Sequence, residues 1–576
     1  MFVFRFLIIL RDCLYSIQFI INMKKKAFSR LLFLGLISTF LVSCGGPSRR
    51  QSSGTGWTMN NPKGGFQFNS AFKEQETGPG LVFVEGGTFT RGKVQDDVMK
   101  DWNNTPTQQH VQSFYMDETE VTNIMYMEYL DWLKKVFPPE EDRFQYIYYG
   151  AIPDTLVWRD RLGFNETMTK NYLRHPAYAD YPVVGVNWLQ AVEFARWRTD
   201  RVNESILERE GFLKRDAKIL AVDADNIFST EAYIDTPTAT FSGNEEVVFR
   251  GRGNRLAQKD DARNVFAQRT TGIILPEYRL PTESEWEYAA TSMVGNREYN
   301  MYRGQKKYPW NGAYTRAGSS GEKGLQLANF KQGKGDYGGI AGWSDDGADI
   351  TAKTKSFPPN DFGLYDMAGN VAEWVADIYR PIVDFEMNDF NYFRGNVYTK
   401  NKIGPERRAE MYTSDNMKYD TLSNGKIINK SFPGQIIEVP VDENETYLRH
   451  NFSTSNNKDY RDGDKPSTQF FKEVESDDPT KKDAKRMYNS PVHSIKRDSV
   501  GNIIKKHDAT GKRKTLINDN VRVYKGGSWK DREYWLDPAQ RRYYPEDMAT
   551  DYIGFRCAMS RVGSKSKNKR KPRHVR

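Results

Sequence analysis

The sequence has 576 residues, a formal net charge of +9, and 38% hydrophobic and 13% aromatic residues. A chain of this length can bury a large core, and its negative mean hydropathy excludes a protein built from many membrane spans. The 45 glycines and the aromatic content favour a turn-rich globular protein over a helical bundle or a disordered chain. The basic charge belongs to the two ends: residues 1–43 carry a net +5 and residues 561–576 a net +8, which leaves −4 for residues 44–560. This distribution does not indicate a nucleic-acid groove, and we expect no nucleic-acid partner.

Residues 1–43 are typical of a leader with a signal peptide. Met23 and three lysines precede an apolar run over residues 27–42, which is shorter than the roughly 20 residues of a bilayer span. The run ends in Leu-Val-Ser before Cys44, which resembles a bacterial lipobox. This resemblance implies cleavage before Cys44, lipidation of its thiol and new amino group, and firm attachment to a membrane by several acyl chains. The alternative is a buried cysteine behind a signal anchor; Met23 is also a candidate true start.

The cysteine content limits the chemistry. With Cys13 removed in the leader and Cys44 lipidated, Cys557 stands alone. That excludes a disulfide framework, a zinc cluster and a paired-cysteine redox site within one chain. No acidic run follows Cys44, which favours an outer membrane lipoprotein on the periplasmic face over one exported to the cell surface.

Residues 44–80 are rich in Gly, Ser, Pro, Asn and Lys, and predict a flexible tether. Residues 81–92 predict two strands around a Gly86-Gly87 turn, and residues 114–122 predict another strand. Thr122 is a candidate cap for a helix over residues 123–137. The apolar face expected for this helix consists of Ile124, Met127, Leu130 and Leu133.

Two later segments carry capping boxes, in which a cap side chain and a residue three positions on satisfy each other's backbone groups. Asn187 and Gln190 open a helix with Trp188, Ala191, Val192 and Ala195 facing inward, and residues 200–270 are expected to form an irregular insertion. Thr282 and Glu285 open a second helix that buries Trp286 and Ala289. Since regular strand–helix–strand alternation is missing, the fold class is α+β.

Residues 363–377, GLYDMAGNVAEWVAD, are expected to contain a glycine turn and a helical end pinned into the core by Trp374. On a helical turn, Asn370 and Glu373 lie on one face. Both a core turn and an ion site built from these oxygens fit the pattern. Residues 81–377 would then be the first part of a domain.

Residues 378–520 form a polar insertion that is far longer than ordinary loops, and is therefore either functional or partly disordered. Residues 521–560 complete the domain, and residues 561–576 form a basic tail without an acidic residue. The tail fits an acidic partner protein, anionic lipid head groups, or solubilising charge. Its candidate partner-binding residues are Lys565, Lys567, Lys569, Arg570 and Lys571.

Motifs in a fixed order carry a family resemblance. They are EGGTF, DETEVTN, PVVGVNW, YRLPTESEWEYAA, FPPNDFGLYDMAGNVAEW, KGGSW and GFRC. The ordered set resembles the formylglycine-generating enzyme, or sulfatase-modifying factor, domain. The resemblance implies a C-type-lectin-like, loop-rich α+β fold with a long insertion.

A narrower resemblance rests on the lipobox, GPGLVFVEGGTF, HVQSFYMDETEVTN and the insertion opening DIYRPIVDFEMNDFNYFRGN. These stretches look like the gliding-motility lipoproteins of Bacteroidetes of the GldJ or GldK type, of which we favour the GldJ type. This implies a structural component of the gliding and type IX protein secretion machinery. Its partners would be other proteins of that machinery within a large assembly, which could be a ring or a filament.

The resemblance also bears on catalysis. Active family enzymes carry two cysteines after the GGSW-like motif, and soft thiolates suit Cu(I). Residues 528–536 contain no cysteine, and the six histidines lack the short spacing of a metal pair. We therefore expect no copper, no catalytic residues and no enzyme activity, with a periplasmic metal-dependent oxygenase or a glycan-binding module as alternatives. Trp535, Arg541, Arg542 and Tyr543 are candidates for lining the former cleft, although the two arginines are expected instead to pair with buried acids and support the fold.

The family's calcium layer has matching positions here. The resemblance implies possible calcium ligands at Asn329, Phe330, Asp346, Ala348, Asn370 and Glu373. Hard oxygen ligands of this kind suit calcium, which would tie long loops together. The alternative is a solvated acidic loop that contains Asp345, Asp346 and Asp349.

Overall fold

The computed structural model divides the chain into two compact units, Met1–Ala71 and Phe72–Arg576. The residues that it describes are 51–59, 66, 74–93, 103–160, 162–213, 224, 227–237, 240, 266–293, 306–319, 321–333, 346–380, 389–395, 399–405, 407–422, 425–440, 496–497, 503–504 and 520–563. In the first unit, Gln51 and Thr58 form an isolated antiparallel bridge. The predictions for residues 1–43, Cys44, Asp345 and residues 564–576 lie outside the described residues. Among the described helices, none is long and apolar enough to cross a bilayer.

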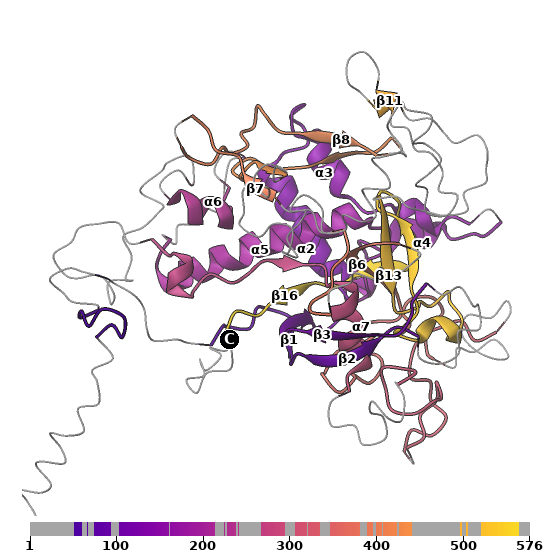
Figure 1. The fold of residues 1–576 in the computed structure, drawn as a ribbon. Coiled ribbons are helices and arrows are strands. Elements are labelled where there is room, and N and C mark those ends of the chain that lie inside the picture. Colours follow the sequence, from indigo (N-terminus) through magenta and orange to yellow (C-terminus); the bar gives the residue numbers. More distant parts are fainter. Residues whose placement is uncertain are drawn as a thin grey trace, which may run out of the picture. The chain divides into compact units, whose positions relative to one another are not determined.

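A four-stranded sheet in the order β1-β4-β16-β5 joins distant parts of the second unit (Figure 1). Its strands are Leu81–Val84 (β1), Phe114–Asp117 (β4), Ala558–Ser560 (β16) and Tyr278–Arg279 (β5). A hairpin of Gly87–Arg91 (β2) and Thr107–Val111 (β3) stands apart from this sheet. The strands on either side of Gly86-Gly87 therefore exist but do not pair with each other. Gly86 is needed there because a Cβ would lie 2.4 Å from the Ser113 nitrogen and the Val111 oxygen.

The second four-stranded sheet has the order β14-β13-β6-β15. Its strands are Arg542–Pro545 (β14), Val521–Lys525 (β13), Ala372–Ile378 (β6) and Ile553–Phe555 (β15), and β6 and β15 run parallel. The expected helical turn around Asn370 and Glu373 is wrong, because Glu373 lies in the strand β6. Asn370 adopts a positive φ of 56°, which turns the chain into the strand. Pairing with strands on both sides overrides the local three-residue spacing.

Both capping boxes are confirmed. Asn187 and Gln190 cap the helix Trp188–Glu210 (α5), and Thr282 and Glu285 cap the helix Glu283–Thr291 (α7). The first helix ends 13 residues beyond Trp197, so part of the expected irregular insertion is helical. Ala191 and Ala195 are buried, whereas Trp188 and Val192 are half-buried against the core.

The helix Asn123–Val136 (α2) is also confirmed, but its cap and its face differ from expectation. The Thr122 side chain makes no capping hydrogen bond. The buried face is formed by Tyr126, Tyr129, Leu130, Leu133 and Val136, while Ile124 is exposed. The buried face therefore includes large aromatic side chains, which bury more apolar area than the aliphatic residues that were expected there.

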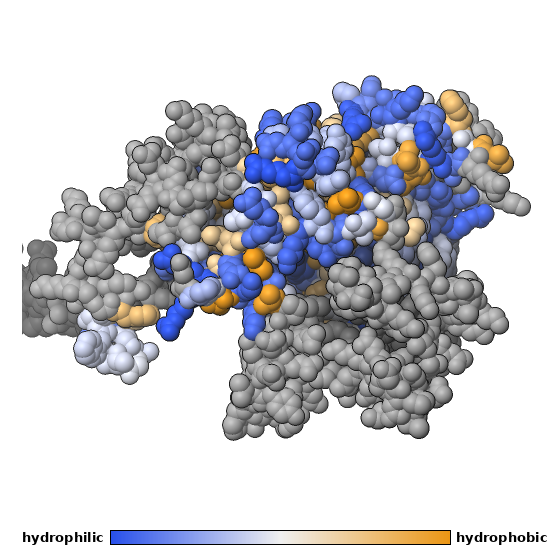
Figure 2. Space-filling model, turned by 90° about the horizontal axis from the view of Figure 1, so that it is seen from above, coloured by the Kyte–Doolittle hydropathy of each residue, from blue (hydrophilic) through white to orange (hydrophobic). Residues whose placement is uncertain are grey.

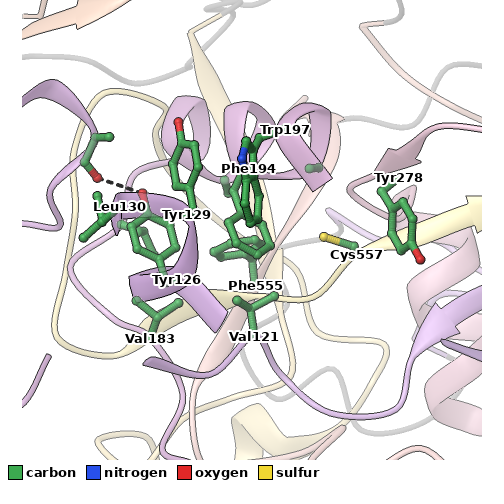
Figure 3. Packing of buried hydrophobic residues seen from close by; sticks show 14 of the residues in the cluster. Val121, Tyr126, Tyr129, Leu130, Val183, Phe194, Trp197, Tyr278, Phe555 and Cys557 are labelled. Carbon is green, nitrogen blue, oxygen red and sulfur yellow. Dashed lines mark hydrogen bonds between the residues drawn. The ribbon is translucent and has the colours of Figure 1, made fainter. Parts of the chain in front are cut away.

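The main core lies where α2 and α5 meet β15 (Figure 3). The Tyr126 and Phe194 rings stack with centroids 5.5 Å apart, and Phe555 packs edge-on against Phe194. The Tyr126 hydroxyl donates a hydrogen bond to the Ala151 carbonyl at 2.8 Å. Cys557 is buried in the same cluster.

Part of the long insertion is folded onto this core. Ile427–Asn429 (β9) contacts the helix Gln145–Ala151 (α3), and Phe432 packs against Trp132 and Phe137. Its other strands are Thr399–Asn401 (β7), Tyr419–Thr421 (β8), Glu438–Pro440 (β10), Lys496–Arg497 (β11) and Ile503–Ile504 (β12). The remaining helices among the described residues are Thr155–Trp158 (η1), Glu166–Asn171 (α4), Pro176–Tyr178 (η2), Thr230–Asp235 (α6), Arg269–Thr271 (η6) and Glu533–Leu536 (η9).

The fold thus mixes helices and short strands with long loops, as expected. Figure 2 shows that the described surface on one face is mostly hydrophilic, with small separate hydrophobic spots. Such spots are normal for a soluble surface and do not by themselves mark an interface.

Candidate functional site

The turn after β13 is the candidate site, because the KGGSW motif lies there. Gly526 and Gly527 adopt φ values of 97° and 69°, so both occupy the left-handed region that favours glycine. A Cβ on Gly527 would lie 2.8 Å from the Trp535 carbonyl oxygen. The glycines therefore bring residues 528–531 close to the η9 segment.

An ion pair closes this turn. The Asp531 carboxylate accepts two hydrogen bonds from Arg542, at 2.6 and 2.7 Å, in a bidentate arrangement. The Ser528 hydroxyl donates to the same carboxylate at 2.6 Å. The Arg542 guanidinium lies 4.6 Å from the centroids of both the Tyr524 and Trp535 rings. Burial opposes the charge on Arg542, but the Asp531 carboxylate outweighs it, and the pKa of Arg542 is raised.

The other side of the turn is aromatic. The Trp529 indole donates to the Asp551 carbonyl at 3.1 Å and stacks on Trp158 with centroids 6.2 Å apart. The Lys530 ammonium binds the Asp551 carboxylate at 2.8 Å. Ser528, Lys530 and Asp531 of this turn are thus all engaged, with each other or with Asp551 and Arg542.

A buried charge network lies behind the turn. Glu283 binds Arg91 and Arg541 at 2.6 Å each, and Lys525 lies 2.8 Å from Glu287. Burial raises the pKa of Glu283, but Arg541 and Arg91 outweigh it, so the pKa is lowered. Arg541 and Arg542 therefore both pair with acids, which confirms one of the two readings of these arginines.

Five of the six candidate calcium residues come together. The Asn329 amide nitrogen donates to the Ile350 carbonyl at 2.7 Å and lies 3.4 Å from the Asn370 Oδ1. The Asp346 carboxylate accepts from the Phe330 and Ala348 backbone nitrogens at 3.4 and 3.1 Å. The Asn329 Oδ1 is buried and has no hydrogen-bond partner within the described residues.

A buried amide oxygen without a hydrogen-bond partner fits a hard cation. A cation at this position would satisfy the Asn329 oxygen, since calcium binds amide, carbonyl and carboxylate oxygens. Across the described ranges, no group of three or more His, Cys, Asp and Glu side chains is placed to hold a metal. Any cation here would therefore depend on amide and carbonyl oxygens in addition to Asp346.

The sixth candidate, Glu373, is engaged with other partners. Its carboxylate accepts from Arg556 at 2.6 and 2.7 Å and from the Trp286 indole at 2.8 Å. Glu120, which the sequence analysis did not single out, accepts from the Asn370 amide at 2.7 Å. Burial, then the charges of Asp366 and Glu373, raises the pKa of Glu120 well above its usual value.

The signal for Arg556 was present in the sequence. A charged residue inside the otherwise apolar GFRCAM segment requires a buried partner. Its neighbour Cys557 donates its backbone N–H to Asp117 at 2.8 Å, and burial, followed by the Asp117 charge, raises the pKa of its thiol. A buried thiol with a raised pKa is unreactive, so Cys557 is a core residue.

Residues 67–422 match the family described as the Sulfatase-modifying factor enzyme 1-like domain. The chain belongs to this family. The Formylglycine-generating enzyme of Mus musculus is 24% identical over 298 residues, which cover 52% of this chain and 58% of that protein. The chain therefore spans just over half the length of this relative.

The sulfatase-modifying factor family includes members named as inactive. The Inactive C-alpha-formylglycine-generating enzyme 2 of Mus musculus is 38% identical over 104 residues, covering 18% of this chain and 27% of that protein. The solved structure of PvdO from Pseudomonas aeruginosa shares 14% identity and covers 83% of this chain and 94% of that one. Its TM-score of 0.35 is too low to establish a common fold.

Proposed function

We propose that this protein is a non-catalytic lipoprotein that acts as a structural component of the Bacteroidetes gliding motility and type IX secretion machinery, of the GldJ type rather than the GldK type. The observation that carries the proposal is the ion pair of Asp531 and Arg542 in the turn after β13. By the family resemblance, active enzymes carry their copper-binding cysteines in this turn. Here a carboxylate occupies the turn and is already bound by an arginine.

This ion pair is poorly suited to redox chemistry. A carboxylate is a hard ligand, whereas the copper chemistry of the family depends on soft thiolates. Releasing Asp531 for a metal would leave the mostly buried Arg542 without its counter-charge, which is costly. The arrangement therefore supports a structural role for the turn.

The proposed location is the periplasmic face of the outer membrane, with lipid on Cys44. The lipobox-like sequence before Cys44 supports this location. The described parts of the insertion, between residues 389 and 440, add surface to the domain. We propose that they dock other proteins of the machinery in a large assembly.

Metal analysis of the purified mature protein tests the absence of catalysis. We expect no stoichiometric copper or iron, and an unchanged metal content in the Asp531→Asn variant. Stoichiometric copper or iron, together with oxygen-dependent turnover that is lost in Asp531→Asn, would overturn the proposal in favour of a periplasmic oxygenase. Mass spectrometry of the mature N-terminus should show acylated Cys44, and a cross-linked pull-down should recover secretion-machinery proteins.

We also propose that calcium is held at Asn329, Phe330, Asp346, Ala348 and Asn370. The orphaned Asn329 oxygen supports this site. Glu373, the remaining candidate, would take part only after releasing Arg556 and Trp286. The ion would tie the loop at residues 346–352 to the corner at Asn370.

A further inference from the structure

The first and last described segments of the second unit are bound to each other. The Gln75 amide oxygen accepts from the Val562 backbone nitrogen at 2.7 Å, and the Gln75 amide nitrogen donates to the Ser560 carbonyl at 3.4 Å. Arg561 binds the Glu74 carboxylate at 2.6 Å. We call residues 74–76 and 560–563 the terminal clamp.

The terminal clamp is built into the domain. The Arg561 side chain is 4% exposed, and its guanidinium lies 4.5 Å from the centroid of the Phe83 ring in β1. Glu76 binds Arg209 of α5 at 2.7 Å. Both acids of the clamp thus have cationic partners, so they do not add unpaired negative charge to this edge.

The clamp determines where the two outer parts of the chain begin. The segment that leads back to Cys44 leaves at Glu74, and the basic tail leaves at Gly563, from the same edge of the domain. Thirty residues separate Cys44 from Glu74, which limits the distance between them to about 100 Å. The tail therefore starts beside the root of the segment that carries the proposed lipid.

The composition of the tail indicates an electrostatic partner. After Arg561, which the clamp uses, seven Lys and Arg residues remain up to residue 576, with no acidic and no aromatic residue. Specific protein interfaces centre on buried aromatic and apolar anchors, which this tail lacks. Clusters of four to eight Lys and Arg residues next to a membrane anchor are typical of binding to anionic lipid.

We propose that the basic tail binds the anionic head groups of the leaflet that holds the acyl chains of Cys44, and so holds the clamp edge of the domain against the membrane. This inference rests on the proposed lipidation of Cys44. One attachment alone would leave the domain free to move away from the bilayer over the length of the tether. A second attachment at the same edge fixes its orientation.

The experiment uses the lipidated mature protein in vesicles of phosphatidylcholine, with and without phosphatidylglycerol. Energy transfer from the 12 tryptophans to a dansyl-labelled lipid reports how close the domain lies to the bilayer. We expect higher transfer in the anionic vesicles. Raising the salt from 0.1 to 1 M, where the screening length falls from about 10 to about 3 Å, should abolish the difference.

Two charge-matched variants test the role of the tail. The first changes Lys565, Lys567, Lys569, Arg570 and Lys571 to Gln, and should lose the difference between the two lipid compositions. The second changes five exposed lysines elsewhere to Gln and should keep it; these are Lys135, Lys307, Lys353, Lys402 and Lys430. Equal transfer in both lipid compositions, or equal loss in both variants, would overturn the inference and leave an acidic protein as the partner.

Flotation with neutral vesicles separates this inference from the proposed lipidation. A lipidated chain floats with neutral vesicles whatever its tail. Failure to float would refute the lipid anchor, while salt-sensitive flotation with anionic vesicles alone would still support the tail as a membrane-binding segment.

Discussion

At the scale of single residues, the ion pair of Asp531 with Arg542 in the turn after β13 leads to a stability prediction. The Asp531 carboxylate and the Arg542 guanidinium are 15% and 13% exposed, so water screens the pair only partly. We predict that Asp531→Asn lowers the free energy of unfolding by about 3 kcal/mol, because it leaves the arginine without its counter-charge. Denaturant titration would measure this loss.

The matched control is Asp131→Asn. Asp131 also pairs with a cation, Lys135, but these side chains are 63% and 70% exposed. Exposed pairs contribute little, so the control should change stability by at most about 0.5 kcal/mol. Similar losses in the two variants would contradict the idea that burial makes the Asp531 pair important.

The carboxyl group of Asp377 leads to a prediction of how stability depends on pH. Burial, and then the charge of Glu283, raises the pKa of Asp377 to about 6, compared with about 3.9 in an unfolded chain. The folded state therefore holds this proton more tightly. The stability from this group is present below about pH 4 and is lost as the pH rises to about 6.

The Asp377→Asn variant cannot titrate at this position. Between pH 4 and pH 7, the free energy of unfolding of the wild type should fall relative to the variant by about 2 kcal/mol. Urea titrations at several pH values would measure this difference in slope, whatever the variant's absolute stability. Parallel pH profiles would show that Asp377 does not carry this dependence.

The roles of some residues could be predicted from the sequence, and those of others could not. The arginines Arg541 and Arg542 were expected to pair with acids, and they do. The partners could not be named, because Glu283 and Arg541 are 258 residues apart and meet only in the folded chain. Glu373 was placed with Asn370 by local spacing, whereas its partner Arg556 lies between the last two strands, β15 and β16.

At the scale of elements, the two threonines that precede helices α2 and α7 give a matched comparison. The Thr282 hydroxyl accepts from the Glu285 nitrogen at 3.2 Å, whereas the Thr122 hydroxyl is buried with no hydrogen-bond partner within the described residues. Thr→Val keeps the shape and removes the hydroxyl. We predict that Thr282→Val costs about 1 kcal/mol, and that Thr122→Val is neutral or stabilising.

Thermal unfolding of both variants would test this contrast. A loss of stability in Thr122→Val would mean that its hydroxyl has a role that the described contacts do not include. The sequence indicated a candidate cap at both sites, but a threonine before a helix shows only where a cap could form. Whether its hydroxyl turns toward the backbone depends on the packing around it.

The folded part of the insertion gives a second element-scale prediction. Phe432 is 4% exposed and contacts Trp132 and Phe137 of the main core. We predict that Phe432→Ala lowers the free energy of unfolding by about 3 kcal/mol, through the cavity that it leaves. Ile403→Ala, in the same insertion but 59% exposed, should change it by at most about 0.5 kcal/mol.

Calorimetry of both variants would show whether this segment unfolds with the domain. A separate transition for the insertion, with the main transition unchanged in Phe432→Ala, would contradict its attachment to the core. The polar composition of residues 378–520 hid this segment from sequence reasoning, because a few large residues such as Phe432 suffice to attach it.

At the scale of the whole molecule, the fold class was predictable, but the pairing of strands was not. Turns, caps and apolar runs are local, and they predicted α2, α5 and α7. The sheet orders join residues that are hundreds of positions apart, and no local pattern specifies them. The adjacent strands β1 and β2, which belong to different sheets, show this limit most clearly.

Calcium should act on the whole molecule by binding the folded state. At a concentration 100 times its Kd, it would add about 2.7 kcal/mol to stability and raise the Tm. We predict that chelation lowers the Tm and that Asn329→Leu removes the response, since Asn329 supplies the orphaned oxygen. An unchanged Tm on chelation of the wild type would count against the site.

The positions of the last four strands also have a consequence for synthesis. Strand β16 lies between β4 and β5, and β13 and β15 flank β6 on its two sides. A nascent chain emerges with its N-terminus first, so neither sheet can be completed until residues 521–560 have been made. The polypeptide thus stays incompletely folded until these last strands have been synthesised.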